Sequence, residues 1–345
     1  MEKQKKIWLN IILVIVILLT MITIVSSMND MQAVLSLMGT LDIPFFLLAL
    51  LLGLISFILM SLSSQFVLTA LNKDLPFSIG FLIQATEPFF NGITPFSSGA
   101  QPFQLYYYHK HKVDPNHATS VIVVNFILFQ ITSVLLSTIG LIAFWQDIYN
   151  AMGGNMTFIV IGYTINTAIL VGLFLVAYIK KAYRLFEKLF SFFQKFKLTN
   201  KLATNLHEKT FGFVTKFQQG VQFLFTKKRV FILGALFKLL SLITLYSTTI
   251  FIVVSLGFEI NLNDNIYIVV AGILATTTMM FVPLPGASGG TEAAFVGLMS
   301  VLFITGINAS SAVTIMLLWR VATYYFGMLY GLIAYLILKQ KEVKL

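Results

Sequence analysis

Four ionisable side chains lie inside strongly apolar stretches of the sequence: Glu87, Lys238, Glu292 and Arg320. Lys238 and Arg320 stand about ten residues inside long apolar runs, and an α-helix rises about 1.5 Å per residue. Glu87 and Glu292 stand beside breaks rich in glycine and proline. If these runs cross a bilayer, all four side chains lie near the middle of a hydrocarbon core about 30 Å thick. A lone charge at that depth costs at least ~2.5–3.5 kcal/mol, so each one is expected to face a partner or a polar cavity.

Two interpretations fit these four charges. Arg320 or Lys238 can pair with Glu87 or Glu292 and simply tie helices together. Alternatively, the charges line a cavity for a charged lipid head group, where the Arg320 guanidinium can grip a phosphate with two parallel hydrogen bonds. Lys238 has a third option, because its long side chain can extend toward the cytoplasmic surface.

The two breaks supply a second kind of binding group. The segments 91–99 and 285–291 expose backbone N–H groups and hydroxyls, and a helix that begins after such a loop points free N–H groups at an anion. A structural alternative is that Thr291 caps the following helix and Glu292 complements its dipole. The residues predicted to bind a lipid head group are Glu87, Asn91, Thr94, Lys238, Ser288, Thr291, Glu292 and Arg320.

The elements that must position these residues are membrane helices. Hydrophobic residues make up 58% of the 345-residue chain and charged residues 10%, whereas about a quarter of a soluble domain is charged. This composition excludes a soluble enzyme, a disordered chain and a disulfide scaffold. There is no cysteine, which removes thiolate metal sites. Segment 286–290 matches G-x-S-x-G, but no histidine stands deep in an apolar run to act as its base; we expect no catalytic residue, metal or cofactor.

We predict an all-α polytopic membrane protein with about six full transmembrane helices and two re-entrant hairpins, forming one domain over 1–345. Proline and glycine break the apolar stretches 77–108 and 266–304, so each is interpreted as a hairpin that enters the membrane and returns; two short spans are an alternative for the second. The hairpins enter from opposite sides, so halves 1–179 and 229–345 form the inverted repeat typical of secondary transporters. Gly327 and Gly331 form a helix-packing motif. The predicted full spans are 7–28, 44–70, 117–145, 157–179, 229–257 and 310–338.

The distribution of basic residues predicts the orientation. The connections 29–42, 146–156, 258–265 and 305–309 contain no lysine or arginine, and the first three of them hold acidic residues. Cytoplasmic loops carry the excess of lysine and arginine, so both termini are expected on the cytoplasmic side of a bacterial-type cytoplasmic membrane.

A basic segment, 180–228, separates the two halves. Between residues 180 and 229 there are 12 basic and two acidic residues, with phenylalanines at helical spacing. An amphipathic helix on the anionic inner leaflet fits this pattern, and a plain orientation signal fits it equally; the aromatic spacing argues against nucleic acid. The residues predicted to contact the membrane surface are Arg184, Lys188, Lys195 and Lys197.

Two motifs resemble those of a known family. The segment 87–95, EPFFNGITP, followed by GAQP at 99–102, and the segment 283–292, PLPGASGGTE, resemble the two signatures of the lysylphosphatidylglycerol synthase transmembrane family, which includes the flippase domain of the multiple peptide resistance factor. The resemblance implies a translocase that moves aminoacylated phosphatidylglycerol (lysylphosphatidylglycerol) or a related anionic or aminoacylated phospholipid between leaflets, with a role in resistance to cationic peptides.

The resemblance leaves two alternatives open. Members that make the lipid carry a soluble transferase domain, and none is expected within 1–345, which argues against a phosphatidylglycerol lysyltransferase. The chain could instead be a membrane subunit that anchors a separate lipid synthase. A homo-oligomer is compatible with either interpretation.

Overall fold

The computed structural model describes residues 31–71, 75–94, 97–178, 226–280 and 285–343, together with residues 218 and 222. Regular structure in these ranges is helical throughout, and they contain no strand. The predicted all-α class is confirmed. The predicted first span, 7–28, and the predicted surface residues Arg184, Lys188, Lys195 and Lys197 lie outside the described residues.

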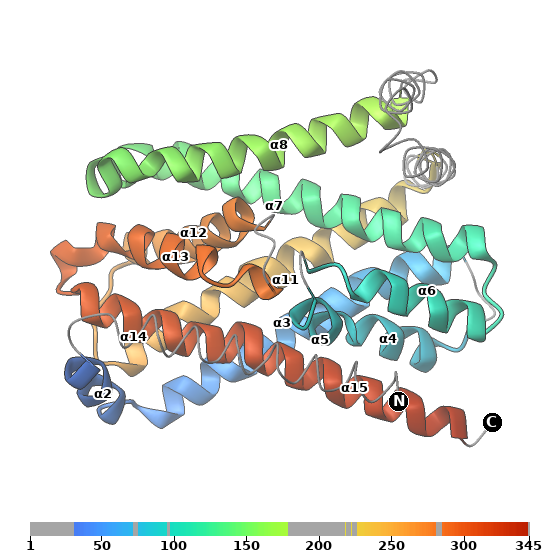
Figure 1. Ribbon diagram of the computed structural model, residues 1–345, viewed down its shortest axis with the longest axis horizontal. Coiled ribbons are helices and arrows are strands. Elements are labelled where there is room, and N and C mark those ends of the chain that lie inside the picture. The colour runs from blue at the N-terminus through green and yellow to red at the C-terminus, as the bar shows by residue number, and fades with distance from the viewer. Residues whose placement is uncertain are drawn as a thin grey trace, which may run out of the picture.

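Four stretches of the described chain are long and apolar enough to cross a membrane: Ile43–Leu71, His117–Gly172, Lys228–Ser255 and Ala309–Lys341. The second stretch turns back on itself at Gly153–Asn155, so it contains two antiparallel helices (Figure 1). The long helices are α3 (Ile43–Leu71), α7 (Pro115–Met152), α8 (Met156–Tyr178), α11 (Lys228–Ser255), and α14 (Ala309–Arg320) continued by α15 (Phe326–Val343). They agree with five of the predicted spans, and the total of six stays a prediction.

The first broken stretch folds as a helical hairpin. It consists of α4 (Phe77–Ala85), α5 (Glu87–Gly92) and α6 (Ala100–Lys110). Pro88 occupies the first turn of α5, where the missing N–H is tolerated. The chain then reverses between α5 and α6, as the glycine and proline residues there predict. We call residues 77–110 the first hairpin.

The second broken stretch folds in the same way from the other end of the molecule. It consists of α12 (Leu262–Met279), the short turn η3 (Pro285–Ala287), α13 (Gly290–Met299) and η4 (Ser300–Thr305). Gly286 and Gly289 have φ values of +61° and +86°, which glycine adopts without a steric penalty. We call residues 262–299 the second hairpin. In Figure 1 the two hairpins enter from opposite ends, and α5 contacts η3 near the middle.

The antiparallel helices α3 and α11 pack against each other along their length. Ser56 Oγ donates to the Ser241 carbonyl at 2.9 Å, and Ser241 Oγ donates to the Ser56 carbonyl at 3.0 Å. Each serine stands thirteen residues after its helix begins (43 to 56 and 228 to 241). A reciprocal pair at equivalent positions fits the predicted two-fold relation between inverted halves, which stays a prediction.

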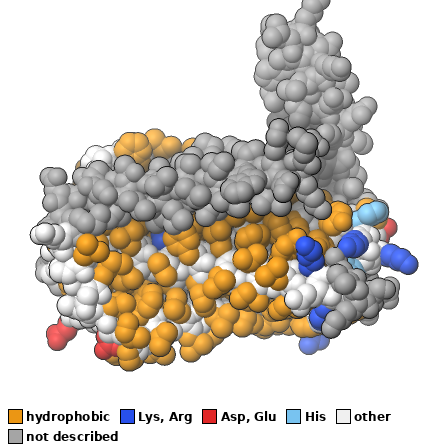
Figure 2. All heavy atoms as spheres, turned by 60° about the horizontal axis from the view of Figure 1, so that its bottom comes forward, with side chains coloured by type: hydrophobic (Ala, Val, Ile, Leu, Met, Phe, Trp, Pro, Cys, Tyr) orange, Lys and Arg blue, Asp and Glu red, His pale blue; other side chains and the backbone are white. Residues whose placement is uncertain are grey.

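The surface divides into an apolar belt and two charged ends. Many large hydrophobic side chains of the long helices are exposed, and Figure 2 shows them as a continuous apolar face between lysine and arginine at one end and acidic residues at the other. A soluble monomer rarely exposes so large an apolar patch. The protein is therefore a multi-pass membrane protein.

Candidate functional site

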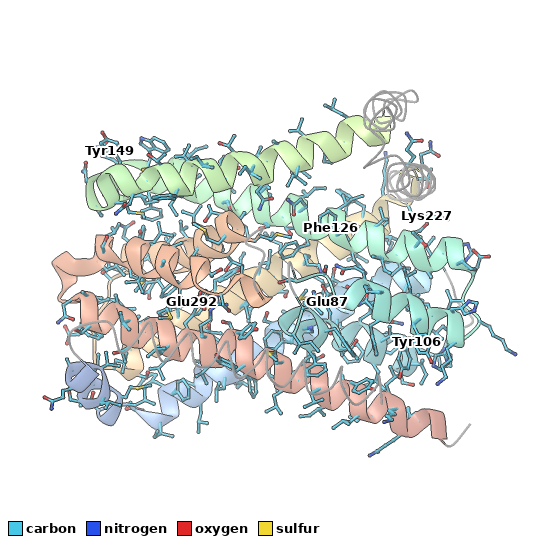
Figure 3. The ribbon with its side chains drawn as sticks, viewed as in Figure 1. Glu87, Tyr106, Phe126, Tyr149, Lys227 and Glu292 are labelled. Carbon is cyan, nitrogen blue, oxygen red and sulfur yellow. The ribbon has the colours of Figure 1, made fainter. Side chains whose placement is uncertain are left out.

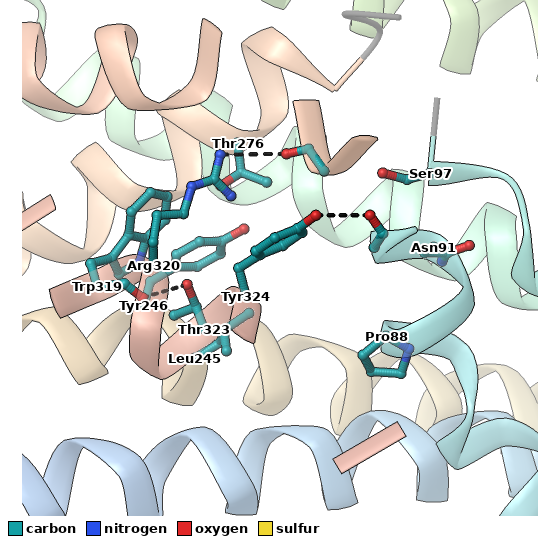
Figure 4. Close-up of a pocket in the computed structure, with 12 residues that line it drawn as sticks. Pro88, Asn91, Ser97, Leu245, Tyr246, Thr276, Trp319, Arg320, Thr323 and Tyr324 are labelled. Carbon is teal, nitrogen blue, oxygen red and sulfur yellow. Dashed lines mark hydrogen bonds between the residues drawn. The ribbon is translucent and has the colours of Figure 1, made fainter. Parts of the chain in front are cut away.

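The two hairpin tips meet at a cavity inside the membrane-spanning part of the protein. The larger of two adjoining cavities has a volume of about 450 Å³ and is lined by both tips and by α3, α7 and α11. The smaller, about 200 Å³, lies on the side of α14 (Figure 4). Both cavities are lined by Asn91, Ser97, Thr276, Gly286 and Arg320.

Arg320 is the last residue of α14 and connects that helix to the second hairpin. Its Nε lies 2.8 Å from Glu292 Oε1, and the two side chains are only 6% and 3% exposed. The guanidinium also donates to the Gly286 carbonyl at 3.4 Å and lies over the rings of Trp319 and Tyr324 (Figure 4). The sequence left open which carboxylate pairs with Arg320; among the described residues it is Glu292.

Glu292 has a second partner in its own hairpin. The Gly289 N–H donates to Glu292 Oε2 at 2.6 Å, so the carboxylate caps the first turn of α13 and complements its dipole. One alternative drawn from the sequence is that Thr291 caps α13, but the Thr291 hydroxyl instead donates to the Ala287 carbonyl at 3.1 Å. The cap is made by the Glu292 carboxylate, which accepts from the N–H of Gly289. The two residues stand three positions apart, which is the spacing of a capping box.

Glu87 and Lys238 line the larger cavity from different elements. Glu87 begins α5 in the first hairpin, and Lys238 lies in the middle of α11 with 1% of its surface exposed. They interact electrostatically, yet the described residues contain no direct ion pair between them. Because only 1% of Lys238 is exposed, its side chain does not extend to the membrane surface. Figure 3 shows Glu87 and Glu292 on the two hairpins, both in the interior near the middle of the molecule.

The remaining predicted site residues of the first hairpin differ in what they contact. Asn91 lines both cavities, and its Oδ1 accepts a hydrogen bond from the Ala100 N–H at 3.0 Å. The Thr94 hydroxyl instead donates to the Phe90 carbonyl and accepts from the Gly99 N–H, both at 2.8 Å. Asn91 is therefore placed to contact a ligand, whereas Thr94 holds the loop together.

On the second hairpin, Thr291 lines the larger cavity. Among the described residues that line the two cavities, neither Ser288 nor Glu292 is present.

Tyr324 is a site residue that the sequence reasoning missed. Its hydroxyl donates to the Gly92 carbonyl at 2.8 Å, and its ring packs on Gly286, so it joins both hairpin tips to the last span (Figure 4). Tyr324 belongs to the π-helical turn Val321–Tyr325, a feature frequent at functional sites. Its position four residues after Arg320 would have indicated a shared helix face.

Uncharged polar groups around the tips were also missed. Asn125 and Thr276 line the larger cavity. Asn166 of α8 donates to the Thr277 carbonyl at 2.8 Å, close to the end of α12. Single polar residues within apolar runs carry no spacing signal, so only the folded chain reveals this grouping.

Comparison with known proteins agrees with this architecture. The family model described as "Lysylphosphatidylglycerol synthase TM region" matches residues 7–331. The chain is also 26% identical over 302 residues to a "UPF0104 membrane protein" of Methanothermobacter thermautotrophicus, with 84% of this chain and 83% of that protein covered. The family match includes both hairpins and Arg320. The chain therefore belongs to the lysylphosphatidylglycerol synthase transmembrane-region family.

Proposed function

We propose that this protein is a lipid translocase of a bacterial-type cytoplasmic membrane, with both termini on the cytoplasmic side. Its cargo is aminoacylated phosphatidylglycerol or a related phospholipid, which it moves between leaflets. The cavity between the hairpin tips holds the head group and opens to one leaflet at a time.

One observation carries this proposal: two broken helices from opposite ends meet at a cavity that contains buried ionisable side chains. Non-helical backbone at membrane depth is tolerated where protein buries it or where it lines a cavity. Substrate sites of inverted-repeat transporters are formed by such discontinuous helices near the bilayer midplane. A cavity of about 450 Å³ falls within the usual size of small-molecule sites, about 300–1,000 Å³.

The orientation rests on charge. In Figure 1 the end of α6 and the start of α11 lie at the end where the first hairpin enters, whereas the starts of α3 and α12 lie at the other end. The basic residues beside the first two helix ends are Lys110, Lys112, Lys227, Lys228 and Arg229, and the acidic residues beside the last two are Asp42, Glu259 and Asp264. Excess lysine and arginine mark the cytoplasmic side.

The proposed physiological role follows from the charge of the cargo. An amine added to phosphatidylglycerol offsets the phosphate charge, so transfer of that lipid to the outer leaflet makes the surface less negative. Cationic antimicrobial peptides then bind less strongly, because their attraction to the surface is electrostatic. A separate synthase would supply the lipid on the cytoplasmic side.

Reconstitution tests the proposal. The purified protein is placed in vesicles that contain a fluorescent aminoacylated lipid, and a membrane-impermeant reagent quenches the outer leaflet. We expect the wild type to expose the inner-leaflet lipid and Arg320→Ala to lose most of that activity. Arg229→Ala, which removes an exposed arginine at the start of α11, is the matched control and is expected to retain it.

Two results would contradict the proposal at different levels. No lipid movement by the wild type would make the translocase function wrong. Movement by Arg320→Ala at the wild-type rate would leave the function intact and make the assignment of the head-group site wrong.

A further inference from the structure

The charges that line the larger cavity can be counted. Its ionisable acidic and basic lining residues, within the described chain, are Glu87, Lys238 and Arg320. Arg320 is already balanced by Glu292 at 2.8 Å. One negative and one positive side chain therefore remain, and the cavity is neutral as a whole.

The two remaining charges are available to a ligand. Lys238 makes no hydrogen bond or ion pair with any described residue, although only 1% of it is exposed. An ammonium has three donors, and a carboxylate accepts through two oxygens. Leaving such groups without hydrogen-bond partners in a low-dielectric interior is costly, so a bound molecule that supplies both partners is strongly favoured.

The two charges lie on different elements, so each would contact a different part of the bound molecule. Glu87 belongs to the first hairpin and Lys238 to α11, and the uncharged side chains of Asn91, Gln101 and Asn125 line the same cavity. A ligand that spans the cavity can place an anion at Lys238 and a cation at Glu87, with hydrogen bonds to the amides of the lining.

We propose, building on the translocase function above, that the cavity selects a net-neutral, zwitterionic head group with one phosphodiester and one primary amine. The phosphodiester lies at Lys238 and the ammonium at Glu87. A head group with no amine leaves Glu87 unpaired, and one with two amines brings a cation for which the cavity has no anion. Either mismatch buries an uncompensated charge.

Two kinds of lipid carry this chemistry: an ethanolamine phospholipid, and phosphatidylglycerol esterified with an amino acid that has a single amine. The test compares four fluorescent lipids in the reconstituted vesicles: phosphatidylethanolamine, alanyl-phosphatidylglycerol, phosphatidylglycerol and lysyl-phosphatidylglycerol. We expect at least one of the two net-neutral lipids to move about tenfold faster than either charged lipid, a ratio that corresponds to about 1.4 kcal/mol. The two net-neutral arms show which source the protein uses.

Single substitutions are expected to shift the preference in opposite directions. Lys238→Met leaves the cavity with a net negative charge and should favour lysyl-phosphatidylglycerol. Glu87→Gln leaves it positive and should favour phosphatidylglycerol. The matched controls are Lys339→Met and Glu259→Gln, which make the same changes at exposed positions and should keep the wild-type preference.

A variant that fails to fold does not remove the test, because the wild-type preference stands on its own. The double variant Glu87→Gln/Lys238→Met also keeps the cavity neutral, and it should move the net-neutral lipids more slowly without gaining a charged one. If the wild type moves phosphatidylglycerol or lysyl-phosphatidylglycerol at least as fast as both net-neutral lipids, the inference is overturned and the translocase function survives. If it moves no lipid, the proposed function itself fails.

Discussion

The ion pair between Arg320 and Glu292 gives the most precise prediction about stability. Glu292→Gln removes the negative charge and keeps the side chain's size. The amide oxygen can still accept the hydrogen bond from the Gly289 N–H, which the carboxylate accepts at 2.6 Å. The substitution therefore isolates the charge partner of Arg320 from the cap of α13.

The expected magnitude depends on how far the pair is removed from water. Arg320 and Glu292 are 6% and 3% exposed and their charged atoms are 2.8 Å apart. Removing one member of a buried pair leaves an uncompensated charge and costs about 3–5 kcal/mol, whereas an exposed pair is worth about 0–1 kcal/mol. We expect Glu292→Gln to lower the free energy of unfolding by about 3–5 kcal/mol.

Equilibrium unfolding in mixed micelles measures this free energy. A double-mutant cycle with Arg320→Met provides the control, because the double variant buries no unpaired charge. The double variant should be more stable than Glu292→Gln alone, since the unpaired buried charge is what makes the single variant costly. A loss below about 1 kcal/mol for Glu292→Gln, or a double variant less stable than both single ones, would refute a strongly coupled, buried ion pair.

Three further substitutions probe the packing around the tips. Tyr324→Phe removes the donor to the Gly92 carbonyl and should cost about 1–3 kcal/mol of stability and slow lipid transport, because a buried acceptor loses its partner. Gly331→Ala should lower stability and disturb the first hairpin, since a methyl group there would lie 2.7 Å from the Phe89 backbone nitrogen. Gly172→Ala, with nothing within 4 Å of the added methyl, should be neutral or stabilise α8 by up to about 1 kcal/mol. The unfolding assay and the vesicle assay measure all three.

Each of these has a clear opposing outcome. Wild-type stability and transport in Tyr324→Phe would show that the tyrosine hydroxyl does not join the hairpin to the last span. Gly331→Ala and Gly172→Ala are matched changes in two helices, so equal effects on stability would contradict the close approach of α15 to α5.

The sequence predicted the fold closely because the deciding signals are local. Apolar runs give the long helices, and the requirement for internal hydrogen bonds in lipid leaves few alternatives to helices. Proline and glycine at 88, 92, 286 and 289 give the breaks, since these residues act through their own backbone. The glycines at 327 and 331 are predicted to form a packing motif, and they approach Phe57 and Phe89.

The sequence alone therefore determined an all-α membrane protein, two broken hairpins and four charges at membrane depth. The folded chain decided that Arg320 pairs with Glu292, that Lys238 has no direct partner among the described residues, and that Tyr324 joins the hairpin tips. A membrane helix is apolar on all sides, so its sequence does not show which face turns inward. Ion-pair partners are chosen by distances of a few ångströms between segments far apart in the chain, and only tertiary packing fixes those distances.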